Sequence, residues 1–363
     1  MDSMEQGLDP RVNNPGDPGG PWHQRFNYPS LWLYIMRALG LHERDSARVG
    51  LVLITGFLFG LWWITADIPV RTSWYYTLIF FSPATMFIIE RCNHDLVIFF
   101  LLGLALLAQR SAVVGMAIVF LAFMLKLFPL AGLLLLLRET RTRALRLTGL
   151  MLLGAAIYIL ATFDDLLVIS RTTERGADTA YGYNVLWHYL RLQRSPWETP
   201  VRAIAYLLVT LSLGAAWWFH RNPVVARSDD RPTRQMDGYR LGAGVYAGTF
   251  LLGNSWDYRL VFFFFAVPQL FIWLRKNHAR CWIALVQLIA FAVASWAMLL
   301  TFWISHSETT FIVARGLEEL GKWTLFASSL WLLAETLPHW ARDLLGFRFR
   351  TQTGSAAAPL APR

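Results

Sequence analysis

Residues 111–138 read SAVVGMAIVFLAFMLKLFPLAGLLLLLR. This stretch is longer than the roughly 20 apolar residues that one membrane-spanning helix needs, and Lys126 and Pro129 interrupt it near its middle. Proline lacks an amide donor and disfavours helix at the residue before it. The stretch therefore predicts two short helices that meet at a bent tip. A single long, tilted helix with a buried lysine is the alternative.

The rest of the chain has the composition of a membrane protein. Of its 363 residues, 55% are hydrophobic and 16% are charged, and the mean hydropathy is +0.40. A soluble fold of this length could not bury so much apolar surface. Apolar blocks between short polar clusters predict an all-α, polytopic protein of about eleven transmembrane helices, some short or broken. The predicted spans are 47–66, 74–89, 96–108, 111–125, 127–138, 147–167, 202–220, 241–253, 260–274, 281–303 and 321–337.

These spans predict one transmembrane domain, residues 47–337. Residues 1–46 form an exterior segment with an interfacial helix near 28–39, and residues 338–363 form a cytoplasmic tail that is disordered at its end. The net charge of +9 comes from arginines in the connectors and not along one soluble face, which favours membrane orientation over nucleic-acid binding. The two cysteines provide no disulfide framework and no cysteine-based zinc site.

The bent tip decides which connectors share a side of the membrane. With two helices in 111–138, the basic segments 138–146, 221–240 and 275–280 fall on one side, which the positive-inside rule makes cytoplasmic. The other side receives the cluster at 90–95, the Lys126 tip, the 168–201 loop and the cluster at 254–259. With one helix, the polar clusters would lie on opposite faces. The sequence therefore predicts that they gather on the exterior face.

The first cluster is Glu90-Arg91-Cys92-Asn93-His94-Asp95. Ionisable groups at membrane depth are costly, so they indicate a functional or a pairing role. One alternative is that Glu90 and Arg91 only cap and pair at a turn between helices. Another is a divalent metal site formed by Glu90, His94 and Asp95, although the sequence offers no diagnostic ligand spacing.

The other clusters allow two interpretations each. Lys126 at the tip could hold a phosphate or diphosphate as a point charge, or it could extend to the lipid headgroups. Asp257 and Arg259 flank Tyr258 and could bind a ligand or form a self-satisfied ion pair. The 168–201 loop interleaves aromatic rings with arginines, which suits sugar and phosphate contact and equally suits a helix lying on the membrane surface.

The order of these motifs resembles a known family. The cluster at 90–95, then Lys126-Leu-Phe-Pro129, then the basic connector 138–146 resemble the Glu-Arg-Gly-Asn-x-Asp and Lys-x-x-Pro pattern of GT-C type membrane glycosyltransferases. The similarity is to the bacterial mannosyl- and arabinosyltransferase-like group. Asn27-Tyr28-Pro29 and Asp257-Tyr258-Arg259-Leu260 resemble further signatures of that group, so the resemblance extends from about residue 9 to about residue 270.

The resemblance implies a polyprenyl-phosphate sugar as donor, a lipid, glycan or protein acceptor, and transfer on the exoplasmic face of the bacterial inner membrane. We expect no cofactor, and a divalent metal is possible but has no support in the sequence. The general base would be a carboxylate in the first exterior loop, for which Asp9 and Asp17 are the candidates. The expected substrate-binding residues are Glu90, Arg91, Asn93, Asp95, Lys126, Asp257, Tyr258 and Arg259.

Two departures from the family pattern leave other functions open. Cys92 replaces the usual glycine, and the chain begins inside what resembles the first exterior loop, so the true base could lie upstream of Met1 in a truncated copy. A transporter or flippase of lipid-linked sugars is one alternative, although such proteins often show internal repeats around a midplane site and none is evident here. A non-catalytic membrane protein is the other.

Overall fold

The computed structural model describes residue 10 and residues 26–66, 68–108, 110–173, 176, 179–221, 233–275, 280–304 and 308–346. The elements of the first half are α2 (Leu31–Ala38), η1 (Glu43–Asp45), α3 (Ser46–Thr65), η2 (Val70–Thr72), α4 (Ser73–Phe80), α5 (Pro83–Glu90), α6 (Asp95–Leu107), α7 (Ala112–Leu125), η3 (Phe128–Arg138), α8 (Arg141–Ala161) and α9 (Phe163–Thr172). Those of the second half are β1 (Ala180–Tyr181), α10 (Val185–Leu192), α11 (Glu198–Arg221), α12 (Arg234–Leu252), β2 (Ser255–Trp256), η4 (Asp257–Phe265), α13 (Val267–Arg275), α14 (Arg280–Ile304), α15 (Glu308–Glu335) and α16 (His339–Leu344).

The predicted all-α class is confirmed, with one short exception. Strands β1 and β2 form an antiparallel ladder in which Ala180 pairs with Trp256 and Tyr181 with Ser255. This ladder ties the loop after α9 to the segment that leads into η4. It thus joins two regions that are far apart in the sequence.

The predicted break at Lys126 is confirmed as well. Helix α7 ends at Leu125, Lys126 has an extended backbone, and η3 begins at Phe128 with Pro129 in its first turn. The two arms pack closely, because a Cβ atom at Gly132 would lie 2.8 Å from the side chain of Val119. The chain therefore reverses direction at this tip.

The prediction of eleven membrane spans is wrong. Only four helices among the described residues are long and apolar enough to cross a membrane, in the windows Ser46–Thr65, Arg141–Ala161, Glu198–Trp218 and Arg280–Ala297. A fifth crossing results if η4 and α13, which meet at an angle of 52°, are taken together.

The shortfall has a physical reason. An α-helix rises about 1.5 Å per residue, so the 13 residues of α6 and the 14 of α7 extend only about 20 Å, against a hydrocarbon layer of about 30 Å. The predicted span 74–89 is divided into two helices by the turn before Pro83. Helices α12 and α15 are longer but carry several charged residues.

The long apolar helices indicate an integral membrane protein. In α3, α8 and α11, only 22%, 17% and 11% of the apolar window is buried within the protein. Leucines of α8 such as Leu150 and Leu160 are 65% and 74% exposed. Apolar surface of this extent marks contact with lipid rather than with water.

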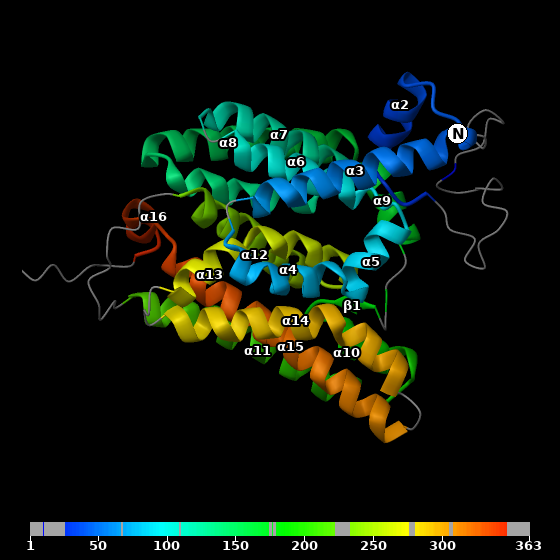
Figure 1. The fold of residues 1–363 in the computed structure, drawn as a ribbon, viewed down its shortest axis with the longest axis vertical. Coiled ribbons are helices and arrows are strands. Elements are labelled where there is room, and N and C mark those ends of the chain that lie inside the picture. The colour runs from blue at the N-terminus through cyan, green and yellow to red at the C-terminus, as the bar shows by residue number, and fades with distance from the viewer. Residues whose placement is uncertain are drawn as a thin grey trace, which may run out of the picture.

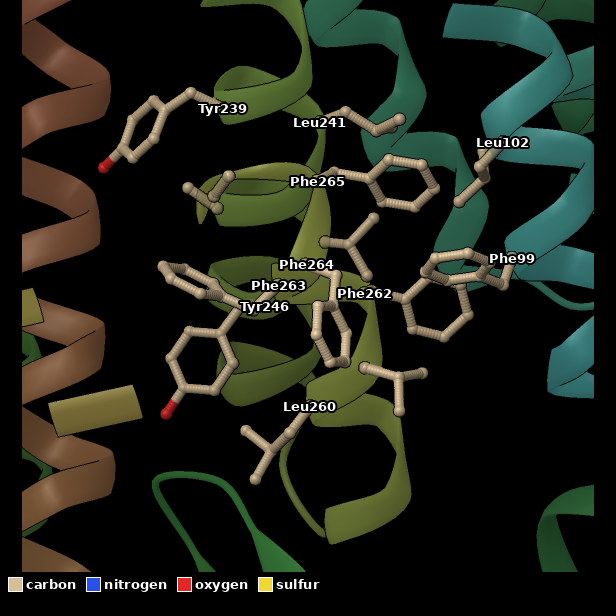
Figure 2. Close-up of a cluster of buried hydrophobic side chains, with 14 of the residues drawn as sticks. Phe99, Leu102, Tyr239, Leu241, Tyr246, Leu260, Phe262, Phe263, Phe264 and Phe265 are labelled. Carbon is tan, nitrogen blue, oxygen red and sulfur yellow. The ribbon is translucent and has the colours of Figure 1, made fainter. Parts of the chain in front are cut away.

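Helix α12 and η4 form the centre of the bundle. Residues 236–247 of α12 are all buried, and four consecutive phenylalanines of η4, Phe262 to Phe265, are almost completely so. Figure 2 shows these rings between Tyr239 and Tyr246 of α12 and Phe99 of α6. The two backbones approach closely because α12 has glycine at positions 238 and 242, and small residues favour close helix packing in membranes.

The bundle has two distinct ends. Helices α2, α5 and α9 lie at one end and α16 at the other (Figure 1). Arg138 at the end of η3 contacts Asp237 near the start of α12 at 3.4 Å, and the indole N–H of Trp340 in α16 donates to the carbonyl of Glu139 at 3.0 Å. The basic connector after η3 therefore lies at the α16 end, opposite the Lys126 tip.

We expect Gly242→Ala to lower the free energy of unfolding by about 1–3 kcal/mol, as overpacking does. A Cβ atom there would lie 2.9 Å from both the amide nitrogen of Ala266 and the carbonyl oxygen of Phe262, and backbone atoms cannot move aside cheaply. Reversible unfolding in mixed micelles, followed by tryptophan fluorescence, measures the change.

Gly248→Ala is the matched control, because a Cβ atom at this position of the same helix meets nothing within 4 Å. It should stabilise the protein by up to about 1 kcal/mol, since alanine is the better helix former. Equal effects of the two substitutions would contradict the close packing of α12 against η4.

Candidate functional site

Asp95 joins three segments of the chain at the end of the bundle that carries α2. Its side chain is completely buried. The ammonium of Lys126 lies 2.6 Å from one carboxylate oxygen, and Nε of Arg259 donates to the other at 3.1 Å. Asp95 begins α6, Lys126 lies at the tip between α7 and η3, and Arg259 belongs to η4. One carboxylate thus holds two cations from distant parts of the sequence.

The turn between α5 and α6 places Asp95. The amide of Asp95 donates to the side-chain oxygen of Asn93 at 2.9 Å, an arrangement that orders the residues just before a helix. Asp95 is the first residue of α6, where the helix dipole stabilises a negative charge. Cys92 has a φ of 43°, the left-handed region in which glycine is most favourable. A glycine at position 92 would fit this backbone.

The sulfur of Cys92 lies against α3. A Cβ atom at Gly50 would be only 2.9 Å from Sγ of Cys92. The absence of a side chain at Gly50 therefore makes room for the thiol. Helix α3 and the α5–α6 turn are in close contact at this point.

The tip at Lys126 is held by its neighbours. The amide of Lys126 donates to the carbonyl of Ala122 at 3.0 Å, which closes the last turn of α7. The indole N–H of Trp32, on α2, donates to the carbonyl of Leu125 at 3.1 Å. Helix α2 thus fixes the end of α7 and, with it, the position of the ammonium.

Arg259 is oriented by two further contacts. Its Nη1 donates to the hydroxyl of Ser255 at 3.0 Å, and its guanidinium lies 5.2 Å from the centre of the Phe128 ring. Phe128 follows the Lys126 tip by two residues. The segment 126–128 therefore supplies both the ammonium of Lys126 and the aromatic ring that the guanidinium of Arg259 contacts.

Aromatic rings cover the cations. The ring of Tyr28 lies 4.8 Å from the ammonium of Lys126, a cation–π distance. His94 lies between Tyr28 and Trp32, with ring centres 4.3 and 4.4 Å away. Burial, reinforced by the positive charge of Lys126, lowers the pKa of His94 to about 4. The imidazole is therefore neutral near pH 7 and adds no charge.

Asp165 of α9 binds the segment that carries Tyr28 and Trp32. Its two carboxylate oxygens accept hydrogen bonds from the hydroxyl of Ser30 at 2.7 Å and from the amide of Ser30 at 3.0 Å. Ser30 directly precedes α2 and lies between Tyr28 and Trp32 in the sequence. The carboxylate therefore fixes the segment that carries both rings over the site.

The charges of the cluster do not cancel. Lys126 and Arg259 are cations, Asp95 is the shared anion, and His94 is neutral, so the four groups carry one net positive charge. The side chains of Lys126 and Arg259 are 14% and 18% exposed, so both cations are mostly buried and only partly accessible from outside the bundle. A low-dielectric surrounding strengthens their attraction for an anion. The site is suited to a phosphate or another anion.

Five of the eight predicted substrate-binding residues meet at this site: Asn93, Asp95, Lys126, Tyr258 and Arg259. Tyr258 is 4% exposed, and its ring stacks on that of Trp256 at 6.4 Å with only 6° between the planes. Arg91 is exposed at the edge, where it lies over the rings of Phe87 at 4.2 Å and Trp256 at 5.8 Å.

Asp257 and Glu90 take other positions. The carboxylate of Asp257 lies 2.8 Å from the ammonium of Lys322 in α15, so the alternative of a self-satisfied pair between Asp257 and Arg259 is wrong. Glu90 is exposed on the surface. The predicted catalytic residues Asp9 and Asp17 lie outside the described residues.

A second buried ion network therefore adjoins the site. Lys322 also contacts Glu318 and donates to the carbonyl of Ala180 in β1 at 2.8 Å. Arg315 lies 2.8 Å from Glu318. Lys322 thus connects α15 to β1 and to the start of η4.

Sequence reasoning missed several of these residues. The spacing of Arg315, Glu318 and Lys322, three and four residues apart in a largely apolar helix, was an available signal of a buried ion network. Nothing in the sequence pairs Ser30 with Asp165. As for metal binding, the structure has no group of three or more His, Cys, Asp or Glu residues arranged as ligands within its described part.

None of the family models, curated proteins or solved structures compared with this chain matches it. What the site can do is therefore inferred from its own geometry and charge.

We expect Asp95→Asn to lower the free energy of unfolding by about 3–5 kcal/mol, the usual cost of breaking a buried ion pair. The loss arises because Lys126 and Arg259 would remain buried with no carboxylate between them. The double variant Asp95→Asn/Lys126→Met should recover part of this loss by removing one cation. Unfolding in mixed micelles compares the two variants.

Asp45→Asn serves as the control. Its partner Arg48 is 86% exposed at 3.4 Å, and surface pairs contribute little to stability. A comparable loss in Asp45→Asn and Asp95→Asn, or no recovery in the double variant, would show that Asp95 is not the anchor of the site.

Cys92→Gly should be about 1 kcal/mol more stable than Cys92→Ala. Both substitutions remove the thiol, but only glycine adopts a positive φ without steric cost. The comparison, made by the same unfolding measurement, isolates the backbone strain from the packing of the sulfur. Equal stability of the two variants would show that the left-handed backbone at this turn is not strained.

Proposed function

We propose that this protein transfers a sugar from a polyprenyl-phosphate donor to a lipid, glycan or protein acceptor at the Asp95–Lys126–Arg259 cluster. The observation that carries the proposal is the pair of cations that share one buried carboxylate and retain a net positive charge. A phosphate is the complementary ligand. The lipid-facing helices around the site favour a phosphate that is carried on a lipid.

Each charged residue has a distinct role in this proposal. Lys126 and Arg259 hold the donor phosphate, the lysine as a point charge and the arginine through its planar guanidinium. Both oxygens of Asp95 are engaged by these cations. Asp95 therefore acts as the anchor that positions them and not as the general base.

The reaction is a displacement at the anomeric carbon. The acceptor hydroxyl oxygen bonds to that carbon while the bond from the carbon to the phosphate oxygen breaks, and the electron pair leaves with the polyprenyl phosphate. The hydroxyl proton passes to a carboxylate base, for which the family resemblance offers Asp9 or Asp17. Lys126 and Arg259 stabilise the additional negative charge on the departing phosphate.

The aromatic residues provide surfaces for the sugar. Tyr28 lies over the ammonium of Lys126 and Trp32 packs against His94, whereas Trp256 and Tyr258 lie on the η4 side. The faces of such rings pack against the apolar faces of sugars, and their polar atoms can orient hydroxyl groups. A phosphate bound by the two cations would thus place its sugar near these rings.

The distribution of basic residues supports an exoplasmic location for this site. Arg138, Arg141, Arg143 and Arg146 lie at or just after the end of η3, at the α16 end of the bundle. The positive-inside rule assigns such a connector to the cytoplasm. The cluster, at the other end, would then face the exterior of a bacterial inner membrane.

A transporter of lipid-linked sugars is less consistent with this arrangement. Alternating access requires a site near the membrane midplane that opens to either side. The Asp95 cluster instead joins the start of α6 to the α7–η3 tip that α2 contacts, and α2 lies at one end of the bundle (Figure 1). This position favours chemistry at one membrane face.

We expect membranes that contain the chain to transfer radiolabelled sugar from polyprenyl phosphate to an endogenous acceptor. Lys126→Met should reduce the rate at least about 100-fold, comparable to the loss of an oxyanion-stabilising group. Arg259→Lys, which keeps the charge but loses the guanidinium geometry, should cause a smaller loss. Incorporation of label into lipid-extractable and polymer fractions measures transfer.

Arg141→Gln is the control, because Arg141 is an exposed arginine at the opposite end of the bundle, and it should retain the wild-type rate. Full transfer by Lys126→Met at wild-type protein levels would refute the assigned role of the cluster. Movement of intact lipid-linked sugar across the membrane without transfer would instead establish the transporter.

A further inference from the structure

A cavity of about 60 Å³ lies at the end of the bundle away from the Asp95 cluster. Five elements line it, with Ile64 from α3, Leu106 from α6, Gly238 from α12, Phe265 from η4 and Phe271 from α13. Its walls are mainly apolar. It is separate from the proposed catalytic site and takes no part in the chemistry above.

The local sequence explains why this space stays open. Pro268 lies where η4 gives way to α13, and the two helices meet at 52°, so α13 turns away from the axis of η4. At Gly238 a Cβ atom would lie 2.7 Å from the carbonyl oxygen of Phe265 and 3.5 Å from the side chain of Leu106. Glycine at this position therefore lets the backbone of α12 pack closely against Phe265 at one wall of the cavity.

The charged residues that line the cavity in the described part of the chain are two arginines. Arg234 at the start of α12 and Arg275 at the end of α13 line it, and none of the described lining residues is a carboxylate. Nη2 of Arg234 donates to the carbonyl of Trp63 at 2.7 Å, which holds this guanidinium at the cavity. An anion is therefore the complementary ligand.

The surroundings indicate that this anion belongs to a lipid. Trp62 and Trp63, at the end of α3 next to the cavity, are 59% and 39% exposed. Exposed tryptophans at the end of a membrane-spanning helix mark the depth of the lipid headgroups. At that depth a phosphate on the arginines would have its acyl chains alongside the apolar walls formed by residues such as Ile272.

We propose that this cavity binds an anionic phospholipid, with its phosphate on Arg234 and Arg275 and the beginning of an acyl chain between α3, α12 and α13. Basic pockets between transmembrane helices are known to suit such headgroups. A lipid here would fill the space at the bend between η4 and α13. It would thereby support the end of the helix whose beginning carries Arg259.

The test measures lipid binding to the full chain in neutral detergent by native mass spectrometry. Phosphatidylglycerol is the probe, phosphatidylcholine the comparison for charge, and inorganic phosphate the comparison for the lipid part. The wild type should bind phosphatidylglycerol more tightly than phosphatidylcholine. Arg234→Gln and Arg275→Gln should each weaken binding of phosphatidylglycerol about fivefold, as expected for one basic residue at a membrane surface.

Two further variants make the test specific. Ile272→Trp keeps both arginines but fills the cavity, so it should abolish binding of phosphatidylglycerol without loss of folded protein. Arg48→Gln removes an exposed arginine at the other end of α3 and should bind phosphatidylglycerol as the wild type does.

Three results would overturn the proposal. Equal binding of phosphatidylglycerol and phosphatidylcholine would show that charge does not select the ligand. Competition by inorganic phosphate at the same concentration as the lipid would show a site for a free anion. Unchanged binding in Ile272→Trp would place the lipid elsewhere on the protein.

Discussion

A single carboxylate in an apolar environment constrains much of this structure. Asp95 is completely buried, and a buried charge must be paired and hydrogen-bonded to be tolerated. Its partners are Lys126 and Arg259, the latter 164 positions away in the sequence. Both contacts form only when the start of α6, the α7–η3 tip and the start of η4 lie next to one another at the same end of the bundle. The need to pair the carboxylate of Asp95 thus fixes the positions of these three segments relative to one another.

Two charged residues near the start of η4 form ion pairs with different parts of the protein. Arg259 points to Asp95, whereas Asp257, two residues earlier, pairs with Lys322 of α15. Lys322 also binds the carbonyl of Ala180 and so includes the strand pairing in the same network. The start of η4 is therefore fixed between two buried ion networks. This arrangement explains how a short helix can present a guanidinium at a defined position.

The parts of this structure that depend on local chemistry were predictable from the sequence. Pro129 and Lys126 within an apolar stretch predicted the reversal, and α3 spans Ser46–Thr65 where residues 47–66 were expected. The predicted number of spans was wrong because every apolar block was counted as a span whatever its length. Helices α6, α7 and η3 are apolar but too short to cross the membrane. The predicted bounds 96–108, 111–125 and 127–138 already had this short length, but it was not weighed against the thickness of the hydrocarbon layer.

The site was predictable where its residues lie in compact motifs and not where a partner is distant. Asn93, Asp95, Lys126, Tyr258 and Arg259 were all expected to share a site. The partner of Asp257 was not, because nothing near it in the sequence indicates Lys322. The same holds for Asp165, whose contact with Ser30 depends on how α9 lies over α2. Such pairings arise from tertiary arrangement and require coordinates.

The contact between Cys92 and Gly50 gives the native chain a chemical reporter. Both cysteines of the protein are free thiols, but the sulfur of Cys92 lies directly against the backbone of α3. Cys92 is only partly exposed, so an alkylating reagent should reach its sulfur faster when α3 separates from the neighbouring turn. The alkylation rate of Cys92 relative to that of Cys281 therefore records how often these helices part, without any substitution in the chain.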